Sequence, residues 1–287
     1  MDNQRESRAS DPHAVPPAPG DIRVGACGYD YPGWAGSVYP AGVTGDAALT
    51  CYARDLGLGV VELPHTYLRM PEPEEMERLR ALAPPGFLFA PKLPETLVSR
   101  VRDPQGGHVR DEAAVERFRA GIAPLLDGGA LACAVAQFPQ KFARGKDSED
   151  HLRWLARALA PVPLAVELRH ESWIAHSVFE RLREWEVTWI AVDSPPRPNM
   201  APFTPWVTAP LAYVRLLGRS QGWDKGPSAA RYEYDYSDLE LRQALDTLMG
   251  MGRQARRLIV TFANYPHGHA VKNALRLREL LGLAPAR

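Results

Sequence analysis

Short apolar runs alternate with longer amphipathic stretches along most of the chain. Eight of the apolar runs are rich in Val, Leu, Ile and aromatic residues, as expected for strands buried on both faces. They predict strands at residues 22–27, 60–63, 87–92, 131–138, 164–169, 189–193, 212–216 and 258–262.

The stretches between these runs have the apolar spacing of helices. They predict helices at residues 47–56, 74–82, 112–126, 148–159, 178–185, 239–249 and 269–281. Thr44 is a candidate N-cap, Ser237 and Glu240 match a capping box, and Gly282 is a candidate helix stop. Strands that alternate with helices indicate right-handed βαβ units and a parallel sheet. About eight such units predict an α/β fold, a single TIM-like (β/α)₈ barrel of parallel strands.

This pattern predicts that the chain has two parts. Residues 22–283 are expected to form the barrel domain, and residues 1–21 a disordered, Pro-rich tail, because that segment has no periodic apolar positions. Three long connections, 28–43, 194–210 and 218–236, each follow a strand, so they are expected on the C-terminal face of the barrel. Trp34 and Trp173 are interpreted as core residues.

Composition narrows the function. The chain has 287 residues, with 34 Lys and Arg against 34 Asp and Glu, so the net charge is zero and tight binding to nucleic acid is disfavoured. No apolar run is long enough to span a membrane. Three cysteines without metal spacing are typical of a reduced cytoplasmic protein. The glycines after the first strand lack the dinucleotide fingerprint, so no cofactor is predicted, and the oligomeric state stays open.

Charged and polar residues stand where the apolar runs stop, and the ends of barrel strands meet at one mouth. Four candidate catalytic residues are Glu62, Lys92, Glu167 and Asp193. Six candidate substrate-binding residues are Arg169, His170, Arg215, Gly218, Arg219 and Asn264. Glu62, Lys92, Glu167, Arg169, Asp193 and Arg215 are expected to converge. The alternative is a buried ion-pair network without a further role.

A metal site is the second alternative. The carboxylates could hold a divalent ion with His65, His170 or His267 as nitrogen ligands, but no metal-binding spacing is present, so no metal is predicted. Cys27 lies in the first loop of the barrel and is interpreted as a packing residue.

Several ordered segments resemble the YecE-like family, also called domain-of-unknown-function family 72. They are IRVGACGYDYPGW at 22–34, VEL at 61–63, PPGFLFAPKLP at 84–94, QFP at 137–139, VELRHESW at 166–173 and YVRLLGR at 213–219. Tyr236-Ser237, and Asn264 with Gly268, Ala270, Asn273 and Ala274, extend the resemblance to residues 22–281. It implies a TIM-like barrel and supplies no reaction. Pro64, Leu217 and Ala263 depart from the family pattern near the mouth, which leaves open an altered or lost activity.

The residues support hypotheses of different classes. The first is an enzyme that acts on a small polar or phosphorylated substrate, with Glu167 or Asp193 as acid or base and Lys92, Arg169 and Arg215 holding negative charge. Lys92 could also form an imine. The others are a non-catalytic protein that binds an anion or nucleic acid, and a metal-assisted phosphodiesterase. An anion site is predicted from Gly218, Arg219 and Asn264, after the last two strands.

Overall fold

Eight parallel strands form a nearly closed barrel in a computed structural model that describes residues 21–99, 107–223 and 228–283. The strands lie in the order β3-β2-β1-β8-β7-β6-β5-β4. They are β1 (Asp21–Cys27), β2 (Val60–Leu63), β3 (Leu88–Pro91), β4 (Ala134–Gln137), β5 (Leu164–Glu167), β6 (Thr188–Asp193), β7 (Leu211–Leu216) and β8 (Arg257–Phe262). Two isolated bridges, Phe89 to Leu131 and Lys92 to Val135, join β3 to the β4 side. The predicted TIM-like barrel is confirmed. Residues 1–20 of the predicted tail lie outside the described residues.

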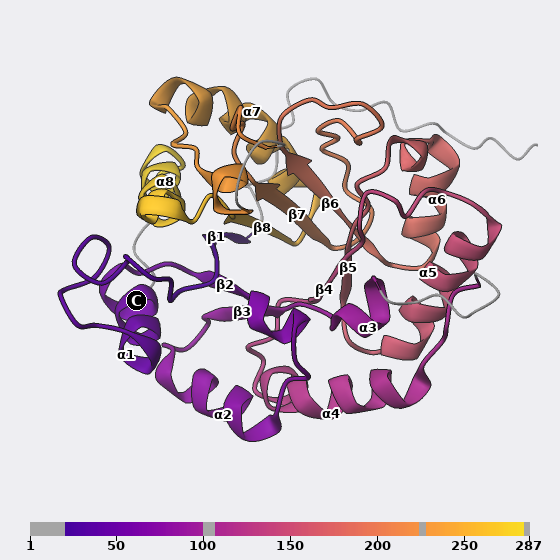
Figure 1. Cartoon of the computed structure of the whole chain (residues 1–287), viewed down its shortest axis with the longest axis horizontal. Coiled ribbons are helices and arrows are strands. Elements are labelled where there is room, and N and C mark those ends of the chain that lie inside the picture. The colour runs from indigo at the N-terminus through magenta and orange to yellow at the C-terminus, as the bar shows by residue number, and fades with distance from the viewer. Residues whose placement is uncertain (1–20, 100–106, 224–227, 284–287) are drawn as a thin grey trace, which may run out of the picture.

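Helices surround the strands (Figure 1). They are α1 (Gly45–Thr50), α2 (Pro73–Leu82), α3 (Glu95–Val98), α4 (Glu112–Asp127), α5 (Lys146–Leu159), α6 (His176–Glu184), α7 (Asp238–Gln254) and α8 (His269–Leu280). Short helical turns are η1 (Cys51–Asp55), η2 (Pro64–Tyr67), η3 (Glu171–Trp173), η4 (Ser228–Tyr232) and η5 (Pro266–Gly268). The helix predicted at 47–56 is therefore divided, since α1 continues as a π-helical turn, η1.

The core has two layers, one inside the barrel and one between the strands and the helices. Val60, Ile190 and Ile259 belong to the inner layer and are almost fully buried. Trp34 and Trp173 lie in the outer layer, where the Trp34 indole N–H donates to the Tyr265 carbonyl at 2.9 Å. The expectation that both tryptophans are core residues is confirmed.

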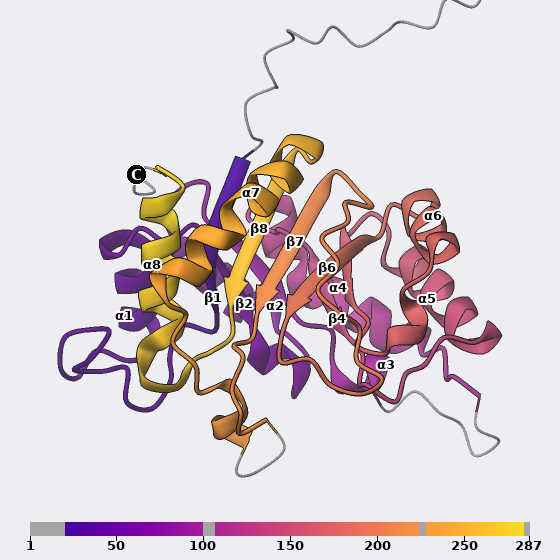
Figure 2. The same ribbon diagram turned by 90° about the horizontal axis from the view of Figure 1, so that it is seen from above.

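The C-terminal ends of the strands define the face on which the site lies. The arrows of β6, β7 and β8 point the same way in Figure 2, and the described parts of the long loops after β1 and β7 lie beyond their tips. The loop after β6, residues 194–210, begins at the same end. The predicted position of the three long connections is confirmed. Within the described residues, no helix has the length and apolar character needed to cross a bilayer.

Candidate functional site

Strand register decides which side chains face the barrel interior. In parallel neighbours, paired residues point to the same side, and Cys27 pairs with Glu62, Gln137 with Glu167, and Arg215 with Thr261. Each of these residues lies two positions after an interior residue of the same strand, as Glu62 follows Val60 and Thr261 follows Ile259, so they also point into the barrel. The last interior layer before the C-terminal mouth is therefore polar, although the layers below it are apolar.

Arg215 on β7 joins the two buried carboxylates of this layer. Its Nε donates to Glu62 Oε1 at 2.9 Å, and its Nη1 donates to Glu167 Oε2. Tyr213 and Thr261 hydroxyls also donate to Glu62 Oε1, at 2.7 and 2.6 Å. The other oxygen, Glu62 Oε2, is buried with no hydrogen-bond partner among the described residues.

Two further cations surround Glu167 at the rim of the layer. Arg169 Nε donates to Glu167 Oε1, and Lys92 Nζ donates to Gln137 Oε1 at 2.5 Å. Gln137 also accepts from Arg215 Nη1 at 3.2 Å. We call Glu62, Lys92, Gln137, Glu167, Arg169 and Arg215 the mouth network.

The charges of the mouth network keep both carboxylates ionised. Burial alone would raise the pKa of Glu167, but Arg169, Arg215 and Lys92 outweigh burial and lower that pKa to about 2. The pKa of Glu62 is lowered in the same way, because Arg215 and Lys92 outweigh its burial. Neither carboxyl carries a proton at neutral pH, so neither can serve as a general acid there.

Cys27 lies beside the network, and Arg215 Nη2 approaches its sulfur at 3.6 Å. Burial, followed by the nearby Glu62 carboxylate, raises the pKa of the Cys27 thiol to about 11. A thiol that stays protonated is a weak nucleophile, which favours the packing interpretation.

Asp193 does not join the mouth network, which corrects the expectation that six charged side chains converge. Its neighbour Val192 is the residue that pairs with Arg215, so Asp193 points to the opposite side of β6. There its carboxylate accepts from Arg219 Nε at 3.0 Å and from the Tyr236 hydroxyl at 2.6 Å. Asp193 is thus a partner of the loop after β7, outside the barrel interior.

Arg219 is likewise occupied. Both its Nε and Nη2 donate to Asp193, and Nη1 donates to Glu240 at 3.3 Å. A guanidinium that faces two carboxylates presents little net positive charge to an anion. Arg219 is therefore engaged by carboxylates of the protein, in contrast to the anion-binding role predicted for it from the sequence.

Gly218 and Asn264 serve the same loop. Gly218 has φ of +91°, and a Cβ there would meet Tyr234 Cβ at 2.6 Å, so a side chain is excluded by both backbone and space. The Asn264 amide donates to the Tyr234 carbonyl at 2.7 Å and to Asn273 at 2.8 Å. Both residues fix the loop between β7 and α7.

The candidate histidines are dispersed. His170 Nδ1 accepts from the Ser172 backbone N–H at 3.1 Å, while His65 faces Glu75 and His267 faces Glu233, each at 3.3 Å. In the part of the chain that the structure describes, no three His, Cys, Asp or Glu residues are grouped to hold a metal ion. The described donors thus offer no ligand set for the phosphodiesterase hypothesis.

Three residues of the site were missing from the candidates: Gln137 and Thr261 of this layer, and Tyr213 of the layer below it. Tyr213 lies two residues before Arg215 on β7, and Thr261 pairs with Arg215 on β8. Tyr213 could have been found from the sequence, because side chains two residues apart on a strand point to the same side, which places Tyr213 on the side of Arg215.

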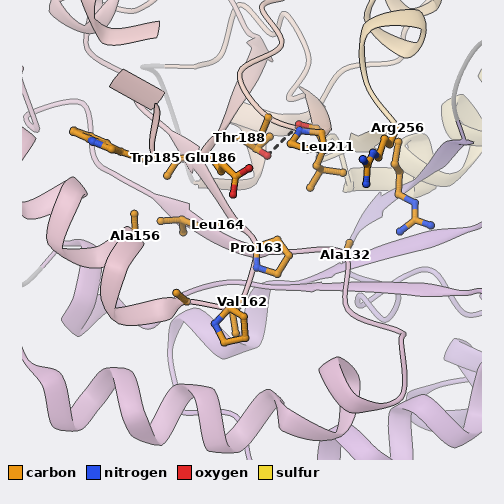
Figure 3. A pocket seen from close by; sticks show the side chains of 16 residues that line it. Ala132, Ala156, Val162, Pro163, Leu164, Trp185, Glu186, Thr188, Leu211 and Arg256 are labelled. Atoms are coloured by element: carbon orange, nitrogen blue, oxygen red, sulfur yellow. Dashed lines mark hydrogen bonds between the residues drawn. The ribbon is translucent and has the colours of Figure 1, made fainter. Parts of the chain in front are cut away.

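A large cavity lies at the opposite, N-terminal end of the barrel. It has a volume of about 520 Å³ and is lined mostly by apolar residues before or at the starts of β5, β6 and β7, including Pro163 and Trp185 (Figure 3). Glu186, Thr188, Arg256 and Arg257 also line it. No member of the mouth network lines it. The charged side chains, rather than this cavity, therefore define the candidate site, because catalytic groups in such barrels gather at the C-terminal face.

These features define the class: a TIM-like barrel with an ion-paired, cation-rich C-terminal mouth. The chain belongs to the DUF72 family, described as a protein family of unknown function, whose model matches residues 23–287. The YecE-like name is a synonym for it, so the resemblance is confirmed.

Relatives resemble the chain in sequence, and two of them also in solved structure. The UPF0759 protein YunF of Bacillus subtilis (strain 168) is 26% identical over 272 residues, which cover 88% of this chain and 95% of YunF. A DUF72 family protein from Thermotoga maritima superposes with a TM-score of 0.82 at 31% identity, over 91% of this chain and 99% of that one. A DUF72 family protein from Enterococcus faecalis V583 gives 0.80 at 26% identity, over 92% and 96%.

Proposed function

We propose that the chain is an enzyme that acts on a small anionic substrate, either a polar acid or a phosphorylated compound, bound at the mouth network. The observation that carries this proposal is an imbalance of charge. Lys92, Arg169 and Arg215 supply three positive charges, whereas Glu62 and Glu167 supply two negative ones. Burying an uncompensated charge is costly, and a bound anion would compensate it.

The solvent exposure of the charged side chains also supports a site for an anion. The side chains of Glu62 and Glu167 are 0% exposed, whereas Arg169 retains 15% exposure. Arg169 Nη2 is a buried donor without a hydrogen-bond partner among the described residues. A ligand that enters the mouth would therefore meet Arg169 and Lys92 before it meets either carboxylate, and an anionic group would supply the missing acceptor.

The proposed roles follow from protonation. Glu62 and Glu167 hold the cations in place and act as positioning residues rather than as acids, because their pKa values are lowered. Lys92 is the proposed catalytic residue, because its amine lies beside Gln137 at the C-terminal end of the strands and its side chain is not fully buried. Arg169 and Arg215 are the proposed charge-stabilising residues.

A non-catalytic anion-binding protein is the second candidate. It is favoured by the ion pairing of both carboxylates, which leaves neither as a ready general acid.

Tight binding of nucleic acid is disfavoured by the zero net charge. Three free, buried cysteines support a cytoplasmic location.

Anion titration tests the proposed site. Phosphate or sulfate should raise the melting temperature, because a ligand at about 100 times its Kd stabilises the native state by about 2.7 kcal/mol. Arg169→Gln should remove most of this response, since it deletes the guanidinium whose Nη2 has no hydrogen-bond partner among the described residues.

Arg219→Gln is the matched control, because Arg219 already faces Asp193 and Glu240. It should leave the anion response unchanged. A response that is insensitive to Arg169→Gln and abolished by Arg219→Gln would overturn the proposed site and restore the anion site expected from the sequence.

A further inference from the structure

The interior side chains at the mouth divide into a charged part and an apolar part. Lys92 and Arg169 follow β3 and β5 on one side. On the β7–β8–β1 side, Leu217, Ala263 and Cys27 are almost fully buried and form one cluster with Trp223. We call these four residues the apolar wall. Leu217 and Ala263, two of the positions that depart from the family pattern, thus belong to it.

A continuous row of aromatic rings extends from this wall. Trp223 lies edge-on to Tyr232 with ring centroids 5.8 Å apart, and Tyr232 lies 5.8 Å from Tyr265. Tyr265 in turn stacks on Tyr31 at 4.5 Å. The four rings come from the loops after β1, β7 and β8, so segments far apart in sequence build one surface. Tyr31, Tyr232 and Tyr265 are each only half-buried, so part of this surface is accessible.

The aromatic row reaches the charged part of the mouth. Cys27 of the apolar wall lies 3.6 Å from Arg215 Nη2 of the mouth network, and Tyr232 packs against the same wall. Tyr232 therefore contacts the apolar wall through Trp223, and that wall contacts Arg215 of the mouth network.

We propose that the ligand of the mouth is an anion that carries a flat apolar ring. Lys92 and Arg169 take the anionic group, while the ring packs against the aromatic row at Tyr232. This assignment rests on the proposed function, because the same cations hold the anion. An anion without a ring would use only the charged part and leave the half-buried tyrosines in water, whereas ring-to-ring packing adds free energy beyond burial alone.

Matched probe pairs test this inference by calorimetry on the full chain. Inorganic phosphate is compared with phenyl phosphate, and acetate with benzoate, so that the two pairs distinguish a phosphorylated ligand from a carboxylate. We expect the ring-bearing member of the preferred pair to bind about tenfold more tightly. Tyr232→Ala should abolish that difference and leave the affinity for the small anion unchanged, whereas Tyr232→Phe should retain it.

Trp206→Ala is the matched control, because Trp206 packs on Phe179 of α6 instead of on the aromatic row. It should preserve the preference for the ring. Equal affinity for both members of each pair, or a preference that survives Tyr232→Ala in a folded variant, would overturn the inference and leave the proposed anion site standing. Failure of all four probes to bind would overturn both.

Discussion

Arg215 is the side chain through which the mouth network is joined, because it contacts both buried carboxylates. Burial would lower the pKa of Arg215, but Glu62 and Glu167 outweigh it and raise that pKa well above its usual value. Removal of one partner from a buried ion pair commonly destabilises a protein by about 3–5 kcal/mol, since the remaining charge loses its compensation.

Glu167→Gln should therefore destabilise the fold by about that amount at neutral pH. Glu167 has a folded pKa of about 2, below its ordinary value of 4.5. Its stabilising contribution is thus complete above pH 4.5 and is lost as pH falls through about 2. The difference in free energy of unfolding between wild type and variant should shrink over that window in denaturant titrations.

Glu116→Gln is the control at the residue scale, because Glu116 pairs with Arg119 on the surface, where ion pairs contribute little. It should change the free energy of unfolding only slightly at each pH. A difference for Glu167→Gln that stays constant down to pH 2 would show that the carboxylate is not held ionised by the network.

Sequence reasoning identified five of the six members of the mouth network but misplaced Asp193, and the reason is physical. On β6 the residues of both faces are apolar from Trp189 to Val192, so no alternation before Asp193 tells which face is interior. Only the pairing of Val192 with Arg215 settles it. A shift of one residue in the strand register moves each side chain to the other face of the sheet.

Helices and strands could be predicted from the sequence where the spacing of apolar residues keeps one period over the whole element. The strand at 60–63 has the predicted bounds, and α2 begins one residue before its prediction, since Pro73 starts it. The four-residue α3 and the π-helical turn η1 were not predicted, because one helical turn has no measurable period and a π turn follows no local propensity rule. The strand predicted at 131–138 is shorter because β4 pairs only over Ala134–Gln137.

The N-terminal cap of α7 gives a prediction for the stability of this helix. Ser237 accepts from the Glu240 backbone N–H, and the Glu240 side chain accepts from the Ser237 backbone N–H, so the capping box of α7 is complete. Ser237→Ala should lower the free energy of unfolding by about 1 kcal/mol. Thr44→Ala is the matched control, because Thr44 is the N-cap of α1 but makes no side-chain capping bond. Equal losses in the two variants, measured by denaturant unfolding, would contradict the assigned cap.

At the scale of the whole molecule, barrel closure brings distant residues together. Arg215 and Glu62 are separated by 153 residues, and Arg215 and Glu167 by 48. The sequence pattern predicted this barrel because strand and helix periods alternate along the chain. It could not predict which charges pair, because pairing depends on the register of β6, β7 and β8, and no local pattern encodes that register.

Crystals soaked in selenate provide the most direct measurement of the central claim, since anomalous scattering locates the anion without assumption. We predict one strong peak within hydrogen-bonding distance of Lys92 Nζ and the Arg169 guanidinium, at the C-terminal mouth. Occupancy should be lost in Arg169→Gln crystals. A peak beside Arg219, or at Arg256 in the lining of the N-terminal cavity, with none at Lys92 and Arg169, would contradict the assignment of the mouth network as the anion site.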